Sequence, residues 1–486
     1  MSGETVGPMV LGIDSSTQST KVEVVELGTG APVATGRAFH IPTTPPVSEQ
    51  NPDSWWTALL EALAQVRESL PHVVAMAVAG QQHGMVLLDQ ENRAVRPAKL
   101  WNDTTSAPQS ERIIGARSPS TWAKLCGSVP GPSFTITKLA WMAEHEEGAL
   151  ATAVRVGLPH DYLNLRITGQ WVTDRGDASG TGYWSPAQNA YVPQALAAAG
   201  ISVESIELPR VADPFDSIGT VTDPQLLQLG LRPSVIVGPG SGDNMAAALG
   251  LGMGPGDLAV SLGTSGTAYA VSPTPTEDPT GIVAGFADAT GNYLPLVCTL
   301  NATKVTETIR GLLGVDHEEF DELARQAALG ANGLILVPYF DGERTPNKPT
   351  ATGALSGLRS SVSRGDLAQA AIEGVTCGLL DGVDALMNNG IVLDGRFFLI
   401  GGGARSAAYR HAFAALAGRP LIVPDVTETV ARGAAVQAAC VHSGDDPSSM
   451  TAKWHLDDGV IQEVPPASGV APQMIRERYQ AEAAFR

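Results

Sequence analysis

Residues 9–27 read MVLGIDSSTQSTKVEVVEL, an apolar run followed by a turn of hydroxyl residues and an alternating run. The pattern predicts a buried strand over residues 9–14 and a second strand over 21–27. The same order recurs at residues 258–271, LAVSLGTSGTAYAV, where GTSG separates two expected strands. A strand–turn–strand unit that returns half a chain later predicts two related domains that face each other across a cleft.

The segments around these units alternate between helical and strand patterns, which is typical of an α/β protein. A helix is expected over residues 54–68, capped by Asp53 or Ser54, and a strand over 73–79. Residues 397–400 read as a strand that leads through GGGARS into a helix ending near 417. The chain is expected to divide into domains at residues 1–236 and 237–486. A last helix is expected from about residue 473. The sequence does not decide where this helix packs, and packing back on the first domain is one option.

The composition excludes several classes of protein. The 486 residues carry a formal net charge of −19, and such a surface repels nucleic-acid phosphates. The same charge repels ATP at long range, so a nucleotide site would need backbone N–H groups, helix N-termini and a divalent metal. No window offers about 20 uninterrupted apolar residues, and the N-terminus lacks a signal-peptide pattern. We therefore expect a cytoplasmic protein without a membrane segment.

The cysteines show no paired spacing. A disulfide framework or a zinc site is not expected, and buried free thiols in a reducing compartment are the simpler interpretation. The four residues are Cys126, Cys298, Cys377 and Cys440.

The two hydroxyl turns are candidate phosphate sites. Backbone N–H groups and hydroxyls in a tight turn can surround phosphate oxygens, and a strand-end carboxylate such as Asp14 can hold hydrated Mg²⁺. Either turn alone could be an ordinary hairpin, because Ser, Thr and Asp favour turns. Two such turns at equivalent places in two repeated units favour phosphate binding. The candidate residues are Ser16, Thr17 and Gln18 in the first turn and Gly263, Thr264, Ser265 and Gly266 in the second.

Two further glycine-rich turns each precede an expected helix. GPGSGDN, residues 238–244, places Asp243 at a helix start, where it could cap the helix or accept a proton from an attacking alcohol. GGGARS, residues 401–406, could let a planar base or ribose lie on a helix N-terminus, or it could be a plain loop. A run of glycines by itself does not decide between these interpretations.

A polar group in the first half of the chain fits a polyol. Gln82 and His83 follow an expected strand end, and Trp101 and Asp103 follow another short run. Together they offer donors, acceptors and an aromatic face. A satisfied structural histidine is the alternative interpretation of His83.

In order along the chain, these motifs resemble the FGGY carbohydrate kinases, most closely the bacterial members that act on ketopentoses. The resemblance spans nearly the whole length, through segments in the family's order. They are GIDSSTQSTK, AGQQHGMVLLD, LWND, residues 159–182, GSGDN, SLGTSGTAYAVS, YFDGERTP and IGGGARS.

The resemblance implies an actin-like α/β fold, with two ribonuclease-H-like domains and ATP in the cleft between them. It implies transfer of the γ-phosphoryl group of MgATP to a terminal hydroxyl of a sugar, with D-xylulose the first candidate and ribulose or glycerol as alternatives. Asp243 would be the general base, and Asp14 would support Mg²⁺ and the phosphates. Gln82, His83 and Asn244 would contact the sugar, and our hypothesis adds Trp101 and Asp103. Near the adenosine the resemblance places GGGARS, with Gly402, Gly403, Ala404 and Ser406.

This sequence departs from the family pattern at two positions. Ser16 stands where relatives usually have glycine, so the turn is expected to differ or to gain a hydroxyl donor. Gln82 stands where methionine is common, and its amide can bond a sugar hydroxyl that a thioether cannot. The second departure leaves the preferred sugar open.

Two functions of another kind are alternatives to sugar phosphorylation. A nucleotide-dependent conformational protein like actin or the heat-shock chaperones would lack the Asp243–Asn244 pair together with a sugar-binding dipeptide. A sugar-sensing regulator without activity is disfavoured by the intact Asp14 and Asp243. The sequence leaves the oligomeric state open, with a homodimer among the options.

Overall fold

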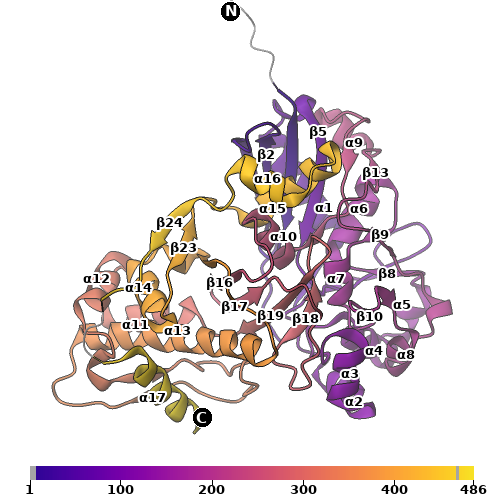
Figure 1. Cartoon of the computed structure of the whole chain (residues 1–486). Coiled ribbons are helices and arrows are strands. Elements are labelled where there is room, and N and C mark those ends of the chain that lie inside the picture. Colours follow the sequence, from indigo (N-terminus) through magenta and orange to yellow (C-terminus); the bar gives the residue numbers. More distant parts are fainter. Residues whose placement is uncertain (1–6, 467–469, 486) are drawn as a thin grey trace, which may run out of the picture. The chain divides into compact units, whose positions relative to one another are not determined.

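A computed structural model of the chain describes residues 7–466 and 470–485, and these form two compact units of α/β structure. Unit 1 comprises residues 1–253, 273–294 and 428–457, and unit 2 comprises 254–272, 295–427 and 458–486. The sequence predicts one division at residue 236/237, whereas both units are discontinuous. The reason is that the chain returns to unit 1 twice, most visibly at α15 (Thr429–Ser443), which packs on strands β1 and β5 (Figure 1).

The main sheet of unit 1 has the strand order β13-β14-β5-β1-β2-β3, with β15 (Ser241–Gly242) also paired to β5. The neighbours β1–β2, β2–β3 and β13–β14 are antiparallel, and β1–β5 and β5–β14 are parallel. Its strands are β1 (Met9–Ser15), β2 (Ser19–Glu26), β3 (Pro32–Phe39), β5 (Val73–Gly80), β13 (Gly219–Thr220) and β14 (Ile236–Val237).

Both faces of this sheet are covered. Leu11 and Ile13 of β1 belong to the core cluster that includes Trp55 and Leu59 of α1 (Pro52–Gln65). Gly12 faces the other way, where a Cβ atom would lie 1.9 Å from the Ala431 carbonyl oxygen of α15. The alternation of side chains along a strand therefore gives one apolar face and one face that a helix approaches closely.

The start of α1 differs from the prediction. The helix runs from Pro52 to Gln65, and its cap is Asn51, whose Oδ1 accepts from the backbone N–H of Asp53 at 3.0 Å. The expected caps Asp53 and Ser54 are wrong because Pro52 fits the first helical position and moves the start towards the N-terminus.

Unit 2 repeats the same sheet. Its strands follow in the order β19-β17-β16-β22-β23-β24, with β19–β17, β17–β16 and β23–β24 antiparallel and β16–β22–β23 parallel. Order and direction match those of unit 1 strand for strand, so the predicted repeat is confirmed at the level of topology. The strands are β16 (Leu258–Leu262), β17 (Gly266–Ala270), β19 (Tyr293–Thr299), β22 (Phe397–Ile400), β23 (Leu421–Pro424) and β24 (Gly459–Gln462).

The long helix α13 (Arg364–Asn388) organises the rest of unit 2. It packs on β17 and on α11 (Thr303–Leu313), α12 (His317–Gln326) and α14 (Ala407–Ala417). The last helix, α17 (Pro472–Ala484), contacts α13, α14 and β20 (Ile335–Val337) and so belongs to unit 2.

Shorter elements complete unit 1. They are β4 (Glu49–Gln50), β6 (Val86–Leu88), β7 (Ala98–Lys99), α2 (Ala107–Ala116), α3 (Pro119–Cys126), α4 (Thr135–His145), α5 (Glu147–Thr152), β8 (Arg155–Gly157), α6 (Pro159–Thr168), β9 (Val172–Thr173), α7 (Arg175–Ser179), β10 (Trp184–Ser185), β11 (Ala190–Tyr191), α8 (Pro193–Ala198), β12 (Arg210–Val211), α9 (Pro224–Leu229), α10 (Asp243–Gly250), β18 (Ala284–Ala287) and α16 (Pro447–Trp454).

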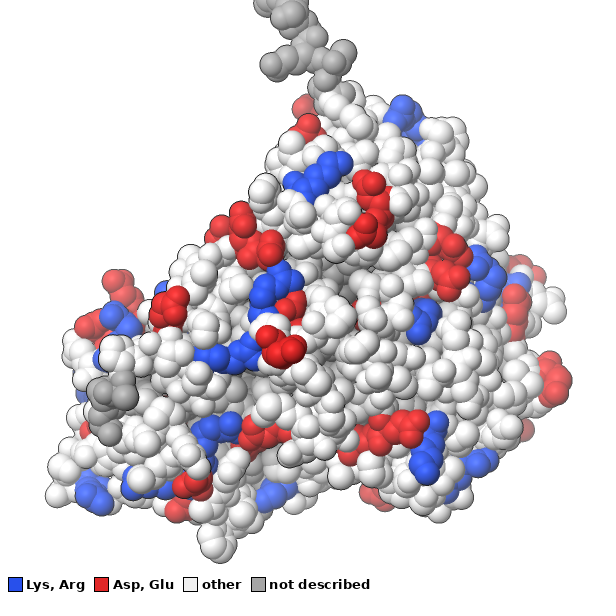
Figure 2. Space-filling model, in the orientation of Figure 1, with Lys and Arg blue, Asp and Glu red and all other residues white. Residues whose placement is uncertain are grey.

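Charged side chains are dispersed over one face of the molecule. On the face shown in Figure 2, Lys and Arg lie in small groups with Asp and Glu, separated by uncharged residues. Within residues 7–466 and 470–485, no helix is both long and apolar enough to cross a bilayer.

Candidate active site

Asp14 lies at the end of β1, where the first hydroxyl turn begins. Its side chain is buried, Oδ1 accepts a hydrogen bond from the Ser16 hydroxyl, and Oδ2 lies 3.8 Å from Nζ of Lys21. Lys21 is shared, because its Nζ also lies 2.5 Å from Oε2 of Glu428. Burial raises the pKa of Asp14 above its ordinary value, opposed by the Ser16 hydrogen bond and by the charge of Lys21. Asp14 is therefore a buried carboxylate with only partial compensation from the protein.

The first turn accommodates serine in place of glycine. Ser16 is not among the non-glycine residues with positive φ in the described part of the chain, so no left-handed conformation is required there. The turn is fixed by its own carbonyls: the Thr17 oxygen accepts from Nε2 of Gln50 at 3.1 Å, and the Gln18 oxygen accepts from the His40 backbone N–H at 2.9 Å. The Ser16 hydroxyl is an added donor, and in this structure it donates to Asp14.

Asp243 begins helix α10, directly after β15. The cap position belongs to Gly242, and Oδ1 of Asp243 accepts from both the backbone N–H and Nδ2 of Asn244, each at 2.8 Å. Burial and, as the smaller cause, the nearby charge of Asp14 raise the pKa of Asp243 to about 7, opposed by the hydrogen bonds from Asn244. A half-buried carboxylate with that proton affinity suits a general base near neutral pH.

Two side chains hold the backbone of the turn that carries Asp243. Gln437 of α15 uses both ends of its amide on Gly240: Oε1 accepts from the Gly240 N–H at 2.9 Å, and Nε2 donates to the Gly240 oxygen at 3.0 Å. Nδ2 of Asn164 donates to the Pro239 oxygen at 2.8 Å. Gly240 has a φ of 83°, and a Cβ atom there would lie 2.3 Å from the Val78 oxygen. The position of Asp243 therefore depends on side chains that lie far from it in the sequence.

Gln82 and Asn244 form the polar side of this site. Nδ2 of Asn244 donates to Oε1 of Gln82 at 2.9 Å, so a hydrogen-bonded chain runs from Gln82 through Asn244 to Asp243. Nε2 of Gln82 is buried and has no hydrogen-bond partner within the described residues. An unsatisfied buried donor beside a carboxylate is a feature that a hydroxylated ligand would satisfy.

His83 is held rigidly. Nδ1 lies 2.7 Å from the Gly180 carbonyl oxygen, and since a carbonyl only accepts, Nδ1 carries the proton. The ring packs against Phe134 and Phe286, with centroid distances of 5.0 and 5.5 Å. Phe286 lies on β18, in the segment that returns to unit 1, and nothing in its local sequence indicated this contact.

Trp101 and Asp103 have different surroundings. Nε1 of Trp101 donates to Oγ1 of Thr17 at 2.9 Å, which links a predicted sugar contact to the first hydroxyl turn. Asp103 is fully buried, and its carboxylate accepts from the backbone N–H groups of Ser48 and Thr105 at 2.9 and 3.0 Å. The expected sugar contact of Asp103 is not what this arrangement provides. Its carboxylate instead fixes the loop that presents Trp101.

The second hydroxyl turn lies in unit 2, between β16 and β17. The Gly263 oxygen accepts from the N–H and the hydroxyl of Thr303 at 3.0 and 2.8 Å, and the Thr264 oxygen accepts from the Ala302 N–H at 3.2 Å. The start of α11 therefore braces the turn. Thr264 is exposed and Ser265 is half-buried, so both remain open to a ligand, while Gly266 starts β17.

GGGARS forms a short 3-10 turn between β22 and α14. Gly401 has a φ of 86°, and a Cβ atom on Gly403 would lie 2.8 Å from Leu262, whereas one on Gly402 would meet open space. Ser406 caps α14 by accepting from the Tyr409 N–H at 3.1 Å, and its hydroxyl donates to Asp321 at 2.5 Å. Packing accounts for Gly401 and Gly403. The predicted nucleotide contacts of Gly402, Gly403, Ala404 and Ser406 stay predictions.

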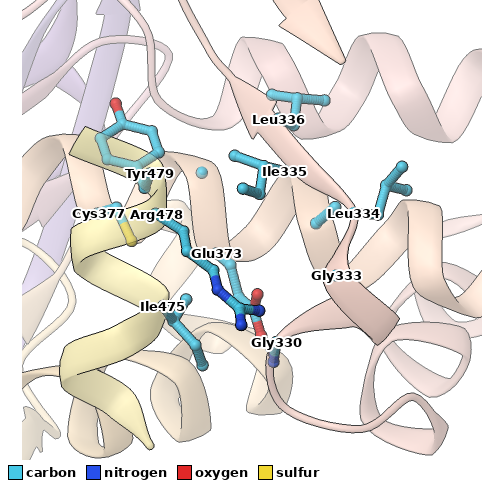
Figure 3. A pocket seen from close by; sticks show the side chains of 12 residues that line it. Gly330, Gly333, Leu334, Ile335, Leu336, Glu373, Cys377, Ile475, Arg478 and Tyr479 are labelled. Atoms are coloured by element: carbon cyan, nitrogen blue, oxygen red, sulfur yellow. Dashed lines mark hydrogen bonds between the residues drawn. The ribbon is translucent and has the colours of Figure 1, made fainter. Parts of the chain in front are cut away.

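A small cavity in unit 2 is separate from these residues. It measures about 20 Å³, room for about one water, and Figure 3 shows Glu373, Cys377 and Tyr479 around it. Oε1 of Glu373 is engaged by the Gly330 N–H at 2.7 Å, and burial raises the pKa of this side chain to about 7. None of the predicted site residues lines this cavity.

Comparison with known proteins agrees with this geometry. Residues 9–250 match the N-terminal domain of the FGGY family of carbohydrate kinases, and residues 258–441 match its C-terminal domain. The chain belongs to the FGGY family of carbohydrate kinases. The resemblance seen in the sequence is thus confirmed, and so is the α/β two-domain fold.

Individual FGGY members are similar over almost the whole chain. The xylulose kinase of Streptomyces rubiginosus is 46% identical over 461 residues, covering 94% of this chain and 93% of that protein. The xylulose kinase of Escherichia coli is 35% identical over 420 residues, covering 85% and 86%. The crystal structure of xylulose kinase from Bifidobacterium adolescentis superposes with a TM-score of 0.86 at 40% identity, covering 98% of this chain and 100% of that one.

Proposed function

We propose that this FGGY kinase transfers the γ-phosphoryl group of ATP to the terminal hydroxyl of D-xylulose and forms D-xylulose 5-phosphate. The observation that carries the proposal is the chain of hydrogen bonds Gln82–Asn244–Asp243 next to Asp14. It supplies an amide pair for sugar hydroxyls and a carboxylate ready to accept a proton. The similarity to xylulose kinases over 94% of the chain supports the choice of sugar.

In this mechanism Asp243 orients the terminal hydroxyl and takes its proton. The sugar oxygen forms a bond to the γ-phosphorus, the bond from that phosphorus to the bridging oxygen breaks, and ADP leaves. Because phosphoryl transfer passes through a loose transition state, alignment and charge neutralisation provide most of the rate. Gln82, Asn244, His83 and Trp101 orient the sugar, and Gln437 holds the turn that carries the base.

A magnesium ion fits the residues near Asp14. Asp14 and Asp243 are two carboxylates whose charges interact, and Lys21, the cation closest to Asp14, is shared with Glu428. The resulting negative charge and the carboxylate and hydroxyl oxygens suit Mg²⁺. When bound with ATP, the ion would neutralise phosphate charge. Asp14 and the Ser16 hydroxyl are the residues assigned to it and its waters.

The nucleotide contacts are proposed from the turns of each unit. Ser16, Thr17 and Gln18 of unit 1 and Gly263, Thr264, Ser265 and Gly266 of unit 2 are assigned to phosphates. Gly402, Gly403 and Ala404 are assigned to the adenosine, with Ser406 beside them as the helix cap. Because ATP is the phosphoryl donor, we also place the enzyme in the cytoplasm, and we assign it no nucleic-acid or membrane partner.

The sugar is the least constrained part of the proposal. The amide of Gln82 offers a donor that discriminates among sugars by hydroxyl geometry, so another ketopentose or glycerol is the alternative substrate. A kinase assay that couples ADP release to D-xylulose, L-xylulose, D- and L-ribulose and glycerol separates these. D-xylulose is expected to give the highest kcat/KM. A higher kcat/KM for another acceptor would make that acceptor the proposed substrate. ATPase activity unaffected by every sugar would refute kinase function.

A further inference from the structure

A buried amide, Gln81, directly follows strand β5 and has no partner for its side chain. Gln81 is 1% exposed, and neither Oε1 nor Nε2 has a hydrogen-bond partner within residues 7–466 and 470–485. An amide side chain can accept two hydrogen bonds and donate two, and burying one that makes none costs about 1–3 kcal/mol in proteins. Such a group is uncommon in native structures and is explained by a ligand, a bound water or a catalytic role.

The backbone places Gln81 beside the first hydroxyl turn. Strand β1 runs parallel to β5, and Ser15 is opposite Gly80 in their register. The Gln81 N–H donates to the Ser15 oxygen at 3.1 Å, which extends this parallel ladder by one residue. Gln81 is therefore opposite Ser16, on a strand about 4.8 Å away.

The other side of the same strand end leads to Asp243. Residues of β5 that pair with β1 on one side pair with β15 on the other, where Gly242 is opposite Gly80. The next position in this register sets Gln81 opposite Asp243. Gln81 thus occupies the middle strand end, between the one that leads into the Ser16 turn and the one that leads into Asp243.

Gln81 and Gln82 belong to opposite faces of the sheet. Side chains alternate along a strand, and residues that are opposite in register share a face. Asp14 is opposite Ala79, so the alternation sets Gln81 on the face of Asp14. Gln82 belongs to the other face, where a Cβ atom on Gly242 would lie 2.7 Å from its Cγ.

The two faces have different tasks in the proposed reaction. Gln82 and its partner Asn244 are assigned to sugar hydroxyls, whereas Asp14 is assigned to the phosphates. The group that passes between the phosphates at Asp14 and the hydroxyl at Asp243 is the γ-phosphoryl group. Carboxylates cannot donate a hydrogen bond to its oxygens, but the amide of Gln81 can.

We infer that Gln81 is a further catalytic residue, and that its Nε2 donates a hydrogen bond to an oxygen of the γ-phosphoryl group during transfer. The inference rests on the proposed function and adds one contact to it. The sugar oxygen bonds to the γ-phosphorus, the bridging bond breaks with its electron pair going to ADP, and Asp243 takes the hydroxyl proton. Gln81 exchanges no proton. A fixed donor aimed at the charge of the transition state is worth about 10²–10³ in kcat in other enzymes.

The kinetic test compares the two neighbouring amides. Methionine is close to glutamine in length and has no amide to donate a hydrogen bond. Gln81→Met should lower kcat for D-xylulose about 10²-fold, with the KM values for sugar and ATP within about threefold. Because the contact is to the phosphoryl group, the factor should be the same for D-xylulose and for the next-best sugar acceptor. Gln82→Met removes a proposed sugar contact, so its main effect should be a higher KM for the sugar, by a factor that differs between acceptors.

Stability without ligands gives an independent readout. The Gln81 amide has no partner in the described chain, so an apolar side chain of similar size removes a desolvation cost. Gln81→Met and Gln81→Leu should therefore unfold at the same temperature as the parent or at a higher one. A structural role predicts the reverse, because loss of hydrogen bonds to the chain or to a buried water lowers stability. Thermal unfolding of the three proteins without sugar and ATP measures this.

Three results would overturn the inference. A kcat of Gln81→Met within about threefold of the parent would show that the amide does not act on the transfer. Loss of stability in both Gln81→Met and Gln81→Leu would show that the amide is a structural group. A kcat loss that differs between the two acceptors by more than about threefold would place the contact on the sugar.

The same assays include Asp243→Asn. An active Asp243→Asn enzyme would refute the proposed function itself. An inactive one, combined with a normal kcat in Gln81→Met, would refute only this inference.

Discussion

The two units share one sheet topology but differ in whether a carboxylate lies beside the turn. In unit 1, Asp14 precedes the turn at the end of β1, the charge of Asp14 acts on Asp243, and the charge of Asp243 acts on Asp177. In unit 2, Ser261 precedes the turn at the end of β16, and the turn itself offers hydroxyls and N–H groups. In the proposed function the repeat supplies two phosphate-binding turns, and the proton chemistry is assigned to unit 1. Similar local sequence patterns serve different tasks because of the groups that the fold brings beside them.

Substitution at the two corresponding positions should give the largest difference. Asp14→Asn is expected to lower kcat about 10²–10³-fold, because the carboxylate assigned to the magnesium ion and phosphates is lost. Ser261→Ala should change kcat less than about fivefold, since it removes one hydroxyl from a turn braced by Thr303. Steady-state kinetics at saturating Mg²⁺ measures both. Equal losses would break the comparison between the units.

The pH dependence of kcat/KM tests the role of the Asp243 carboxylate in unit 1. The raised pKa of Asp243, about 7, means that half of the base is protonated near neutral pH and more of it below. Since only the ionised carboxylate accepts a proton, kcat/KM should fall about tenfold per pH unit below pH 7 and level off above it. An initial-rate series from pH 5.5 to 8.5 measures this. A flat profile would contradict the assignment.

The supports of the turns should separate kcat from KM. Gln437→Leu removes both hydrogen bonds to Gly240 and should lower kcat about tenfold with little change in the KM for ATP. Thr303→Val removes the hydroxyl that braces Gly263 and should raise the KM for ATP about threefold. The reverse pattern would show that the turns do not divide the work as described.

The smallest effect is expected at Ser16. Ser16 does not need a positive φ, so Ser16→Gly relieves no backbone strain in the folded state. Because glycine increases the conformational entropy of the unfolded chain, the substitution should lower the free energy of unfolding by about 0.5–1 kcal/mol. The substitution also removes the hydroxyl that donates a hydrogen bond to Asp14, so kcat should fall a few-fold. Urea unfolding with parallel kinetics measures both. A more stable and more active Ser16→Gly enzyme would show that glycine is the better residue in this turn.

Sequence reasoning predicted the parts of this protein that depend on local patterns. Strands β1, β2, β16 and β17, the hairpin turns and the helix after Gly242 follow from periodicity and turn residues. Asp14, Asp243 and the Gln82–Asn244 pair followed from motifs, although the pairing itself is visible only in the fold.

The remaining features depend on contacts between distant segments. Gln437 lies 197 residues from Gly240, and Phe286 reaches His83 from a segment that returns to unit 1 after a stretch of unit 2. Asp103 was assigned to the sugar because it is polar and near Trp101, but Ser48, 55 residues earlier, engages its carboxylate. Long-range pairing of this kind leaves no periodic signal in one sequence.

The central claim, that Asp243 is the base serving a sugar hydroxyl, is tested most directly by single-turnover phosphorylation of D-xylulose with Asp243→Asn. The amide keeps the size and the bond to Asn244 while losing the ability to take a proton. The phosphoryl-transfer rate is predicted to fall about 10²–10⁴-fold with ATP affinity unchanged. A rate within about threefold of the parent would contradict the account.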